Sequence, residues 1–435
     1  MNFIEELQWR GMIHDMMPGT EEEFKKGITS AYIGFDPTSD SLHIGSLVQI
    51  MILVHLQKAG HKPYALIGGA TGMVGDPSGK SAERNLLDEA TLNKNIEGIR
   101  NQLSQFLDFN SGENSAELVN NYDWFKEFDF LTFIRDVGKH ITVNYMMAKD
   151  SVKSRLETGL SFTEFSYQLI QGYDFFWLYE NKNCKVQLGG SDQWGNIVTG
   201  TELIRKKAKG EAFAVTTPLI KKADGTKFGK TAGGNVWLDK TKTSPYKFYQ
   251  YWFNATDVDA AKYIRIFTVK TKEEIEELEA LHAEDLGSRL LQKELAKEVT
   301  IRVHSEKDFN VAIEASQILF QKGEKALESL KKIDSATFID LFDGVPQAEI
   351  EKSKLKNGIS IIEALVSETK FLKSNGEARR ALKENSISVN KVKVDESKTL
   401  SEEDVLNQNY ILIQRGKKNY FIIKEIINID LLHNS

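Results

Sequence analysis

The sequence predicts an α/β protein, with a Rossmann-like parallel-sheet domain followed by an α-helical domain and a small α+β domain. Two segments, AYIGF (31–35) and PYALIGG (63–69), are short and apolar, as buried strands are. Between them, residues 43–60 carry apolar side chains at helical spacing and end in Gly60, a favourable helix C-terminus. A strand, a helix and a second strand form a βαβ unit. This predicts a parallel sheet whose ligand site lies at the carboxyl ends of the strands.

Composition and charge narrow the class of protein. The 435 residues are 41% hydrophobic and 27% charged, as in an ordinary globular protein, and the net charge of −6 excludes a wholly basic nucleic-acid binder. Cys184 is the single cysteine, so neither an intrachain disulfide nor a multi-cysteine zinc site can form. The first residues are acidic and no run of about 18 apolar residues occurs. We therefore expect a cytoplasmic protein without a signal peptide or a membrane span.

The rest of the chain divides by its residue patterns. Residues 90–180 are mostly helical in pattern and rich in aromatics, and KVQLGG (185–190) is typical of another buried strand. Residues 351–435 alternate in the β period and carry an excess of basic side chains. We therefore expect a sheet domain over 1–220 with a helical insertion around 105–185, a mobile loop and linker over 221–245, a helical domain over 246–325, a linker over 326–350, and the α+β domain over 351–435.

The glycine-rich loop GGATGMVGDPSGKS (68–81) follows the second predicted strand and invites comparison with a Walker A loop. That motif requires glycine at position 74, which is Val74 here, so we exclude P-loop ATPases and kinases. The glycines still let a ligand approach the backbone closely. A plain irregular connection is the alternative for this segment.

His43 lies at the start of the predicted helix, within FDPTSDSLHIGS (35–46). The backbone N–H groups at a helix N-terminus suit a phosphate, and His43 and Ser46 share one face because they are three residues apart. Gly45 leaves room for an adenine ring to pack on the helix. For the motif alone, the alternative is that Ser41 caps the helix and His43 is a solvated residue of its first turn.

The loop DGTKFGKT (224–231) places Lys227 and Lys230 among glycines. Two ammonium groups on a mobile loop can close over a polyphosphate and stabilise the charge that develops in a transition state. A solvated basic loop is the usual alternative. The few lysines and the flanking glycines favour a loop that moves.

Together these motifs resemble the class I aminoacyl-tRNA synthetases. Residues 43–46 (His-Ile-Gly-Ser) are similar to their HIGH signature, and residues 227–231 (Lys-Phe-Gly-Lys-Thr) to their KMSKS signature. The resemblance is closest to the bacterial tyrosyl-tRNA synthetases. YIGFDPTSDSLHIG, GGATGMVGDPSGK, FTEFSYQLIQGYDF, GGSDQWGNI and KADGTKFGKT match that family almost residue for residue, and the resemblance extends over nearly the whole chain.

The resemblance implies a tyrosine–tRNA ligase that works in two steps. ATP activates L-tyrosine to tyrosyl-adenylate with release of pyrophosphate, and the tyrosyl group then passes to the terminal ribose of tRNA(Tyr). The tyrosine carboxylate is ionised at neutral pH, so the first step needs no general base. ATP is a substrate, and we expect Mg²⁺ to travel on its phosphates because no cluster resembles a dedicated metal cage.

The resemblance assigns residues to both substrates. By similarity, the residues that act on the phosphates are Thr38, His43, Lys80, Arg84, Lys227, Lys230 and Thr231, and ATP is bound by His43, Gly45, Ser46, Asp192, Lys227 and Lys230. The tyrosine pocket is assigned to Tyr32, Gly34, Asp36, Asp76, Tyr167, Gln171, Asp174 and Gln193. Tyr167, Gln171 and Asp174 share a helix face by their spacing. A core stripe would show the same spacing, but the polar identity of the last two favours a site.

The chain departs from the two signatures in detail. Ser46 replaces the final histidine of HIGH, and its shorter reach puts that ATP contact in doubt. Phe228 and Gly229 replace the Met and Ser of KMSKS, while both lysines are retained.

The tail carries a separate prediction. Ser374 and Glu377 form a capping-box pattern before a short basic helix, and the segment resembles the S-four type of RNA-binding module. The alternative is a solvated basic surface. The basic residues expected to bind RNA are Arg379, Arg380, Lys383, Lys391, Lys393, Arg415, Lys417 and Lys418. Residues 246–325 correspond to the anticodon-side domain of the family.

Other functions compete with this interpretation. Tryptophanyl-tRNA synthetases share the scaffold, but Tyr32 and Asp174 suit a phenol better than an indole. A small-molecule nucleotidyltransferase would not need the helical part or the tail. A catalytically idle tRNA- or intron-binding protein would not need His43 and the two lysines. The family is a homodimer, and the aromatic segment 122–147 is a candidate interface, although it could equally be core.

Overall fold

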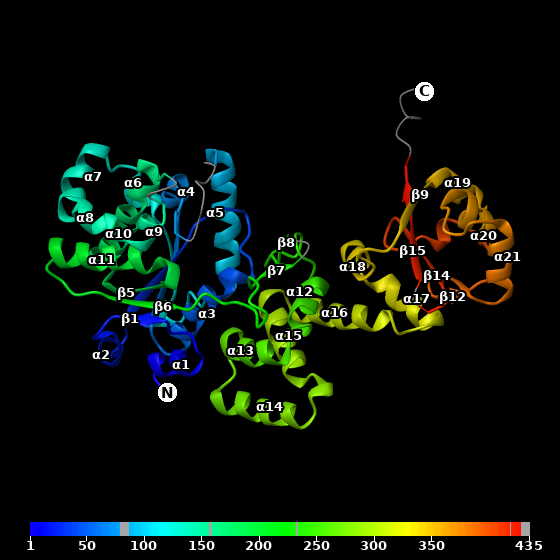
Figure 1. The fold of residues 1–435 in the computed structure, drawn as a ribbon, viewed down its shortest axis with the longest axis horizontal. Helices are drawn as coiled ribbons and strands as arrows, with labels where there is room; N and C mark the ends of the chain where they lie inside the picture. The colour runs from blue at the N-terminus through cyan, green and yellow to red at the C-terminus, as the bar shows by residue number, and fades with distance from the viewer. Residues whose placement is uncertain (79–86, 156–158, 232–233, 418, 428–435) are drawn as a thin grey trace. The chain divides into compact units, whose positions relative to one another are not determined.

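The computed structural model describes residues 1–78, 87–155, 159–231, 234–417 and 419–427. The chain forms two compact units. The first unit contains residues 1–242 and 252–303, and the second contains residues 243–251 and 304–435. Figure 1 shows the elements of each unit with their labels.

The first unit is built on a six-stranded sheet in the order β1-β6-β5-β2-β3-β4. All neighbours are parallel except β1, which pairs antiparallel with β6. The strands are β1 (Asp15–Met16), β2 (Ser30–Phe35), β3 (Lys62–Ile67), β4 (Glu117–Asn120), β5 (Cys184–Gly190) and β6 (Phe213–Thr217). The chain leaves β2 toward β3 and later returns to its other side at β5. The carboxyl ends of β2 and β5 therefore form a topological switch point, where such sheets bind ligands.

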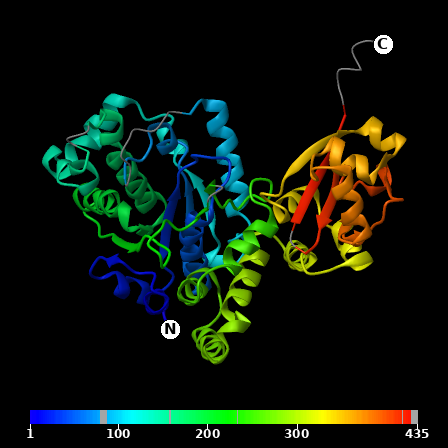
Figure 2. The same cartoon turned by 45° about the vertical axis from the view of Figure 1, so that its right-hand side comes forward.

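Helices cover both faces of this sheet, with α10 and α11 on one side and α5 on the other (Figures 1 and 2). Helix α3 (Ile44–Lys58) follows β2, and α5 (Glu89–Leu103) precedes β4. Helix α10 (Phe162–Lys182) leads into β5, and α11 (Trp194–Lys207) follows it. Ser161 caps α10 by accepting a hydrogen bond from the Glu164 N–H, and Asn183 ends it in the left-handed conformation.

Shorter elements complete the first unit. They are α1 (Phe3–Trp9), α2 (Thr20–Lys25), α4 (Thr71–Val74), α6 (Tyr122–Phe125), α7 (Phe130–Asp136), α8 (Val143–Met147), α9 (Asp150–Lys153), β7 (Lys230–Thr231), β8 (Gly234–Asn235), α13 (Asp257–Phe267), α14 (Lys272–Glu284) and α15 (Leu290–Val303). Helix α12 (Pro245–Phe253) crosses the boundary between the units in the sequence.

The second unit is a five-stranded sheet, in the order β12-β11-β14-β15-β9, with helices on both faces. Its elements are α16 (Glu306–Ile318), α17 (Gly323–Lys332), α18 (Ser335–Leu341), β9 (Gln347–Glu351), α19 (Lys352–Asn357), β10 (Ile359–Ser360), α20 (Ile361–Glu363), α21 (Asn375–Lys383), β11 (Ile387–Val389), β12 (Val392–Lys393), β13 (Thr399–Leu400), β14 (Tyr410–Arg415) and β15 (Asn419–Ile426).

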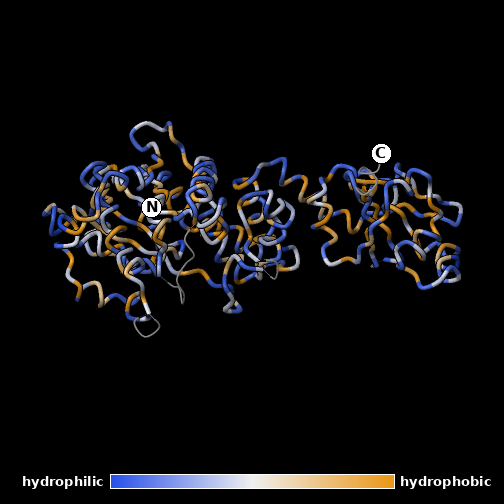
Figure 3. The backbone as a smooth tube through the Cα atoms, turned by 90° about the horizontal axis from the view of Figure 1, so that it is seen from above, coloured by the Kyte–Doolittle hydropathy of each residue, from blue (hydrophilic) through white to orange (hydrophobic). Residues whose placement is uncertain are grey.

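Alternate residues of β14 face opposite sides of the sheet. Ile411 and Ile413 pack with α19–α21, and Leu412 packs with α16–α18. Figure 3 shows that hydrophobic and hydrophilic stretches alternate along the backbone of both units.

The α/β fold class and the strands predicted over 31–35, 63–69 and 185–190 are confirmed. Three strands of this sheet lie outside the expected set: β1 has only two residues, β6 follows a charged stretch, and β4 is a half-buried edge strand inside the region expected to be helical. The expected linker over 326–350 is wrong, because α17, α18 and β9 occupy it. The sheet of the second unit has a second apolar face, and α16–α18 cover it. For the same reason the division at 325 between a helical domain and a linker does not match the two compact units.

Candidate active site

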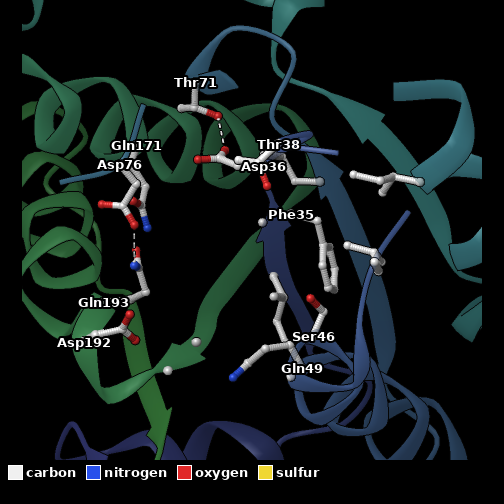
Figure 4. Close-up of a pocket in the computed structure, with 18 of the residues that line it drawn as sticks. Phe35, Asp36, Thr38, Ser46, Gln49, Thr71, Asp76, Gln171, Asp192 and Gln193 are labelled. Carbon is white, nitrogen blue, oxygen red and sulfur yellow. Dashed lines mark hydrogen bonds between the residues drawn. The ribbon is translucent and has the colours of Figure 1, made fainter. Parts of the chain in front are cut away.

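A cavity of about 630 Å³ opens at the carboxyl ends of β2 and β5. In Figure 4, Asp76, Gln171, Asp192 and Gln193 lie on one side of it, and Ser46 lies on the opposite side. Most of the residues predicted to bind tyrosine or ATP line this cavity: Tyr32, Gly34, Asp36, Thr38, His43, Gly45, Ser46, Asp76, Tyr167, Gln171, Asp174, Asp192 and Gln193. Residues from β2, α3, α10 and β5 are thus brought together although they are far apart in sequence.

One end of the cavity holds a buried carboxyl group. Asp174 on α10 is 2% exposed, and each of its oxygens accepts a hydrogen bond. Asn121 Nδ2 donates to Oδ2 at 3.0 Å, and Trp124 Nε1 donates to Oδ1 at 2.9 Å. Burial raises the pKa of Asp174 to about 8, while the two donors act in the opposite direction. The carboxyl group is therefore held in a fixed orientation within a poorly solvated site.

Tyr32 on β2 lies at the same end of the cavity. Its side chain is 1% exposed, and its hydroxyl has no hydrogen-bond partner within the described part of the chain. Burial, together with the charge of Asp174, raises the pKa of the Tyr32 hydroxyl well above its ordinary value, so this group stays protonated. A buried hydroxyl and a buried carboxyl that both face a cavity suit a ligand with a polar end of its own.

A second hydrogen-bonded group lies beside Asp174. Tyr167 Oη donates to Asp36 Oδ2 at 2.8 Å, and Thr71 Oγ1 donates to Asp36 Oδ1 at 2.7 Å (Figure 4). Asn121 Nδ2 in turn donates to Thr71 Oγ1 at 3.1 Å. The network therefore runs without a break from Tyr167 to Asp174, which orients the polar side chains of this wall.

A third group surrounds Asp76. Gln193 Nε2 donates to Asp76 Oδ2 at 2.7 Å (Figure 4), and Asn196 Nδ2 donates to Gln171 Oε1 at 3.0 Å. The backbone N–H of Ser78 donates to Asp76 Oδ1 at 2.9 Å. This wall presents a carboxylate and amide oxygens, which are acceptors for an ammonium group.

His43 is itself the N-cap of α3, and its Nδ1 accepts the Gly45 N–H at 3.0 Å. Because Nδ1 is an acceptor, the neutral ring carries its proton on Nε2. A donor and the helix N-terminus therefore lie together at the cavity, as a phosphate site requires. The alternative in which Ser41 caps the helix is wrong, since Ser41 is buried and its hydroxyl donates to the Leu42 carbonyl at 2.8 Å.

The lysine loop is anchored by the two residues between its lysines, Phe228 and Gly229. Phe228 stacks on Phe267 with ring centroids 5.3 Å apart, and it contacts the rings of Tyr263 and Trp252. Gly229 has φ +82°, and a Cβ there would lie 3.1 Å from Ile44 Cγ1, so its backbone packs directly on the start of α3. The loop is thereby fixed to the helix that begins at His43.

Comparison with known proteins agrees with this site. Residues 25–321 match the family model of "tRNA synthetases class I (W and Y)". The chain belongs to this class I tRNA synthetase family. Residues 337–423 of this synthetase match the model of a "Tyrosine--tRNA ligase SYY-like C-terminal domain".

Similar proteins support the same assignment. The tyrosine–tRNA ligase of Flavobacterium johnsoniae is 62% identical over 431 residues, covering 98% of this synthetase and 100% of the relative. That of Porphyromonas gingivalis is 60% identical over 429 residues, covering 97% and 99%. Among solved structures, a C-terminally truncated mitochondrial tyrosyl-tRNA synthetase of Coccidioides posadasii is 31% identical with a TM-score of 0.64, covering 72% of this chain and 90% of that one.

Some predicted residues of the synthetase are placed elsewhere. Lys227, Lys230 and Thr231 are exposed and are not among the described residues that line the cavity. Lys80 and Arg84 lie outside the described residues. The described residues contain no group of three or more His, Cys, Asp or Glu side chains that could hold a metal ion. Nor is any described helix both long and apolar enough to cross a membrane.

The basic residues of the tail fall into two classes. Exposed positions are taken by Arg379, Arg380, Lys383, Lys393 and Lys417, while Lys418 lies outside the described residues. Arg415 is half-buried and pairs with Glu377 at 2.7 Å. Lys391 is 4% exposed, and its Nζ donates to Tyr420 Oη at 2.8 Å, so the prediction that it contacts RNA is wrong. Its backbone is in the left-handed region, with φ +72°, and its Nζ also donates to the Leu319 carbonyl at 3.4 Å.

Sequence reasoning missed several side chains that hold the polar groups of the cavity in place. Asn121 and Trp124 hold Asp174, Thr71 holds Asp36, and Asn196 holds Gln171. Asn121 and Trp124 follow β4, the edge strand that the pattern did not reveal. The run NNYDWF does combine amides with aromatics, but nothing local connects it to a carboxyl group on α10.

Proposed function

We propose that this class I tRNA synthetase activates L-tyrosine with ATP and transfers the tyrosyl group to the terminal ribose of tRNA(Tyr). The activity is tyrosine–tRNA ligase, as in the relatives at 60–62% identity. The observation that carries the choice of tyrosine is the buried pair of polar groups at one end of the cavity: the Asp174 carboxyl and the unpartnered Tyr32 hydroxyl. A phenol can hydrogen-bond with both, whereas phenylalanine leaves the Tyr32 hydroxyl without a partner, at a cost of about 1–3 kcal/mol, and makes no bond to the Asp174 carboxyl.

The pocket also offers polar partners for the α-ammonium group of tyrosine. The α-ammonium of tyrosine is held by Asp76, Tyr167 and Gln171, whose wall is fixed by Gln193 and Asn196. Gly34, Asp36 and Gln193 complete the tyrosine site. This places the tyrosine carboxylate toward the α3 N-terminus, where the phosphates of ATP bind.

In the activation step, a carboxylate oxygen of tyrosine attacks the α-phosphorus of ATP. The new P–O bond forms as the bond to the β-phosphate bridging oxygen breaks, and pyrophosphate leaves. Thr38, the Nε2–H of His43 and the backbone of Gly45 and Ser46 hold the phosphates, and Asp192 holds the ribose. Lys227, Lys230 and Thr231 close over the pyrophosphate with Lys80 and Arg84, so catalysis consists of positioning and stabilisation of phosphate charge. Mg²⁺ bound to the phosphates would add further charge stabilisation.

A tryptophan enzyme is the second candidate, because the family includes both amino acids. An indole offers a single N–H donor and no acceptor oxygen, so it would leave one of the two buried polar groups unpaired. Exchange of pyrophosphate into ATP, measured with tyrosine, tryptophan or phenylalanine in turn, separates the candidates. We expect exchange with tyrosine alone; exchange with tryptophan and not tyrosine would exclude the proposal.

We propose that tRNA binds in part through the exposed basic side chains of α21. Arg379 and Arg380 project from a helix of nine residues that Ser374 caps. Replacing both by alanine should raise the KM for tRNA and weaken its salt dependence, while tyrosine-dependent exchange stays at the wild-type rate. Equal loss of exchange and charging would contradict this division.

We place the reaction in the cytoplasm, where ATP and tRNA meet.

We also propose a homodimer. An apolar pocket on the first unit is lined by Phe130, Ile134, Val143 and Phe162, and Phe130 and Phe162 are each 65% exposed. Exposed aromatics around one pocket are typical of an interface. A second copy of the chain is the occupant we propose. Sedimentation should give twice the chain mass for the wild type and for the control Val258→Asp, an exposed residue of α13, and a monomer for Phe162→Asp. A dimeric Phe162→Asp variant would count against this surface.

A further inference from the structure

The turn formed by residues 37–42, which leads into His43, is held from outside by helix α5. Asn95 Nδ2 donates to the Pro37 carbonyl at 2.9 Å. Gln102 makes two bonds: its Oε1 accepts the Leu42 N–H at 2.8 Å, and its Nε2 donates to Ser41 Oγ at 2.9 Å. The carbonyl of Pro37, the hydroxyl of Ser41 and the N–H of Leu42 are thus all bonded to one helix.

The helix backbone itself touches the turn at Gly98. A Cβ at this position would lie 2.1 Å from the Asp40 carbonyl oxygen, closer than any side chain allows. Asn95, Gly98 and Gln102 are spaced three and four apart, so they share one face of α5. This face of α5 makes one close backbone contact and three hydrogen bonds with the turn. The two segments are therefore packed together specifically.

The turn is also held by residues 236–242, and this segment contacts the lysine loop because Val236 N donates to the Gly229 carbonyl at 3.1 Å. Ile44 N donates to the Val236 carbonyl at 2.9 Å, and Leu238 N donates to the Leu42 carbonyl at 2.9 Å. Asp239 N donates to Ser41 Oγ at 3.3 Å. The turn therefore lies between α5 and the segment that positions the lysines.

The Ser41 hydroxyl is where the three segments meet. It accepts hydrogen bonds from Gln102 and from Asp239 N, and it donates to the Leu42 carbonyl at 2.8 Å. One proton and two lone pairs are the full capacity of a hydroxyl, so every bond it can make is used. The side chain is 3% exposed, so water cannot readily replace a lost partner.

We propose that Gln102, acting through Ser41, is a positioning residue for tyrosine activation. It fixes the turn that carries Thr38 and ends at His43, in register with the lysine loop. The inference rests on the proposed role of His43 at the phosphates. Loss of Gln102 leaves the Leu42 N–H and the Ser41 hydroxyl without one partner each. The turn can then shift, and a shift of about 1 Å in positioning groups can cost about 100-fold in rate.

The test is tyrosine-dependent pyrophosphate exchange in the full-length chain. Gln102→Leu should lower kcat by about tenfold or more, leave the KM for tyrosine unchanged, and add little to the loss seen in His43→Ala when the two are combined. Gln102→Glu keeps an acceptor for the Leu42 N–H. The Ser41 hydroxyl can donate to the new carboxylate by leaving the Leu42 carbonyl, which keeps Leu238 N as its donor, so this variant should recover part of the rate. Asn101→Leu, the same chemical change at an exposed position of α5, is the matched control and should behave as the wild type.

Each outcome decides the inference. A wild-type kcat for Gln102→Leu beside a strong loss in His43→Ala overturns the inference and leaves the proposed function intact. Additive losses in the double variant, or a raised KM for tyrosine, show a general structural role and overturn it too. If His43→Ala itself has no effect, the phosphate site fails and this inference fails with it. Ser41→Ala, which removes only the oxygen at the node, should repeat the kcat loss of Gln102→Leu, so the test does not depend on one variant folding.

Discussion

Trp124 Nε1 donates a hydrogen bond to Asp174 Oδ1 at 2.9 Å, from the short helix α6 to the middle of the long helix α10. Trp124 also stacks on Trp177, with ring centroids 4.2 Å apart and planes 13° apart. Stacking on Trp177 fixes the indole ring of Trp124, and the indole N–H fixes the carboxyl group of Asp174 by a hydrogen bond. The orientation of the carboxyl group that we propose selects the substrate therefore depends on Trp124, which is not among the described residues lining the cavity.

Trp124→Phe should weaken tyrosine binding while leaving the ring stack largely in place. Removing the N–H donor takes away a bond that favours the ionised carboxyl, so the pKa of Asp174 moves still higher. We expect the KM for tyrosine in pyrophosphate exchange to rise about tenfold, as for loss of one hydrogen bond that orients the carboxyl group, with the KM for ATP unchanged. Trp177→Phe, which removes an indole but no donor to Asp174, should change the KM for tyrosine far less. Equal effects of the two variants would assign Trp124 to packing alone.

Phe228 should control the activation rate from outside the cavity. Its ring is held by Phe267, Tyr263 and Trp252, so Phe228→Ala releases the residue between Lys227 and Gly229. We expect kcat for exchange to fall about 10- to 100-fold, because the lysines lose their fixed starting position. Phe228→Met refills the aromatic pocket with an apolar side chain and should recover much of the rate.

The matched control for that variant is Phe320→Ala, since Phe320 is 85% exposed. It should keep the wild-type rate. A Phe228→Ala variant that is destabilised to heat but exchanges at the wild-type rate would show that the anchor serves folding only.

Sequence patterns predict the parts of the fold and site that local periodicity encodes. The βαβ unit, the shared face of Tyr167, Gln171 and Asp174, and the position of His43 at a helix start all follow from spacing within one segment. The holders of Asp174 do not, because Asn121 and Trp124 reach it across the sheet from a strand that lacks alternation.

The tail shows the same limit. Ser374 caps α21 as the local pattern predicts, but Glu377 Oε2 accepts from Lys373 N and not from Ser374 N, so the capping box is not completed. The β-period alternation of the tail is confirmed by the antiparallel pair β14 and β15. Residues 326–350 look like a linker because their apolar residues have no obvious partner nearby in sequence. That partner is the second face of a sheet built from strands about 60–100 residues away, which local periodicity does not reveal.

Lys391 should make the stability of the chain depend on pH. Burial lowers the pKa of Lys391 to about 8, against about 10.4 in an unfolded chain. Between these values the unfolded chain binds more protons, so the free energy of unfolding rises with pH in that window. Thermal melts of the wild type and of Lys391→Met measure this effect. The melting temperature of the wild type minus that of the variant should increase as pH rises from about 7 to about 10.

The exposed neighbour Lys393 supplies the control for this pH effect. The difference in melting temperature between the wild type and Lys393→Met should not change with pH over the same range. If the difference in melting temperature between the wild type and Lys391→Met also does not change with pH, the Lys391 ammonium group is solvated in the folded chain.

The central claim is that the buried carboxyl of Asp174 selects a phenol. The most direct test is pyrophosphate exchange with tyrosine and with phenylalanine, comparing kcat/KM in the wild type and Asp174→Ala. Tyrosyl-tRNA synthetases are the known case of such discrimination, at about 10⁵. We predict that Asp174→Ala loses most of this ratio through a fall in kcat/KM for tyrosine. An Asp174→Ala variant that keeps the wild-type ratio of tyrosine to phenylalanine would contradict the claim.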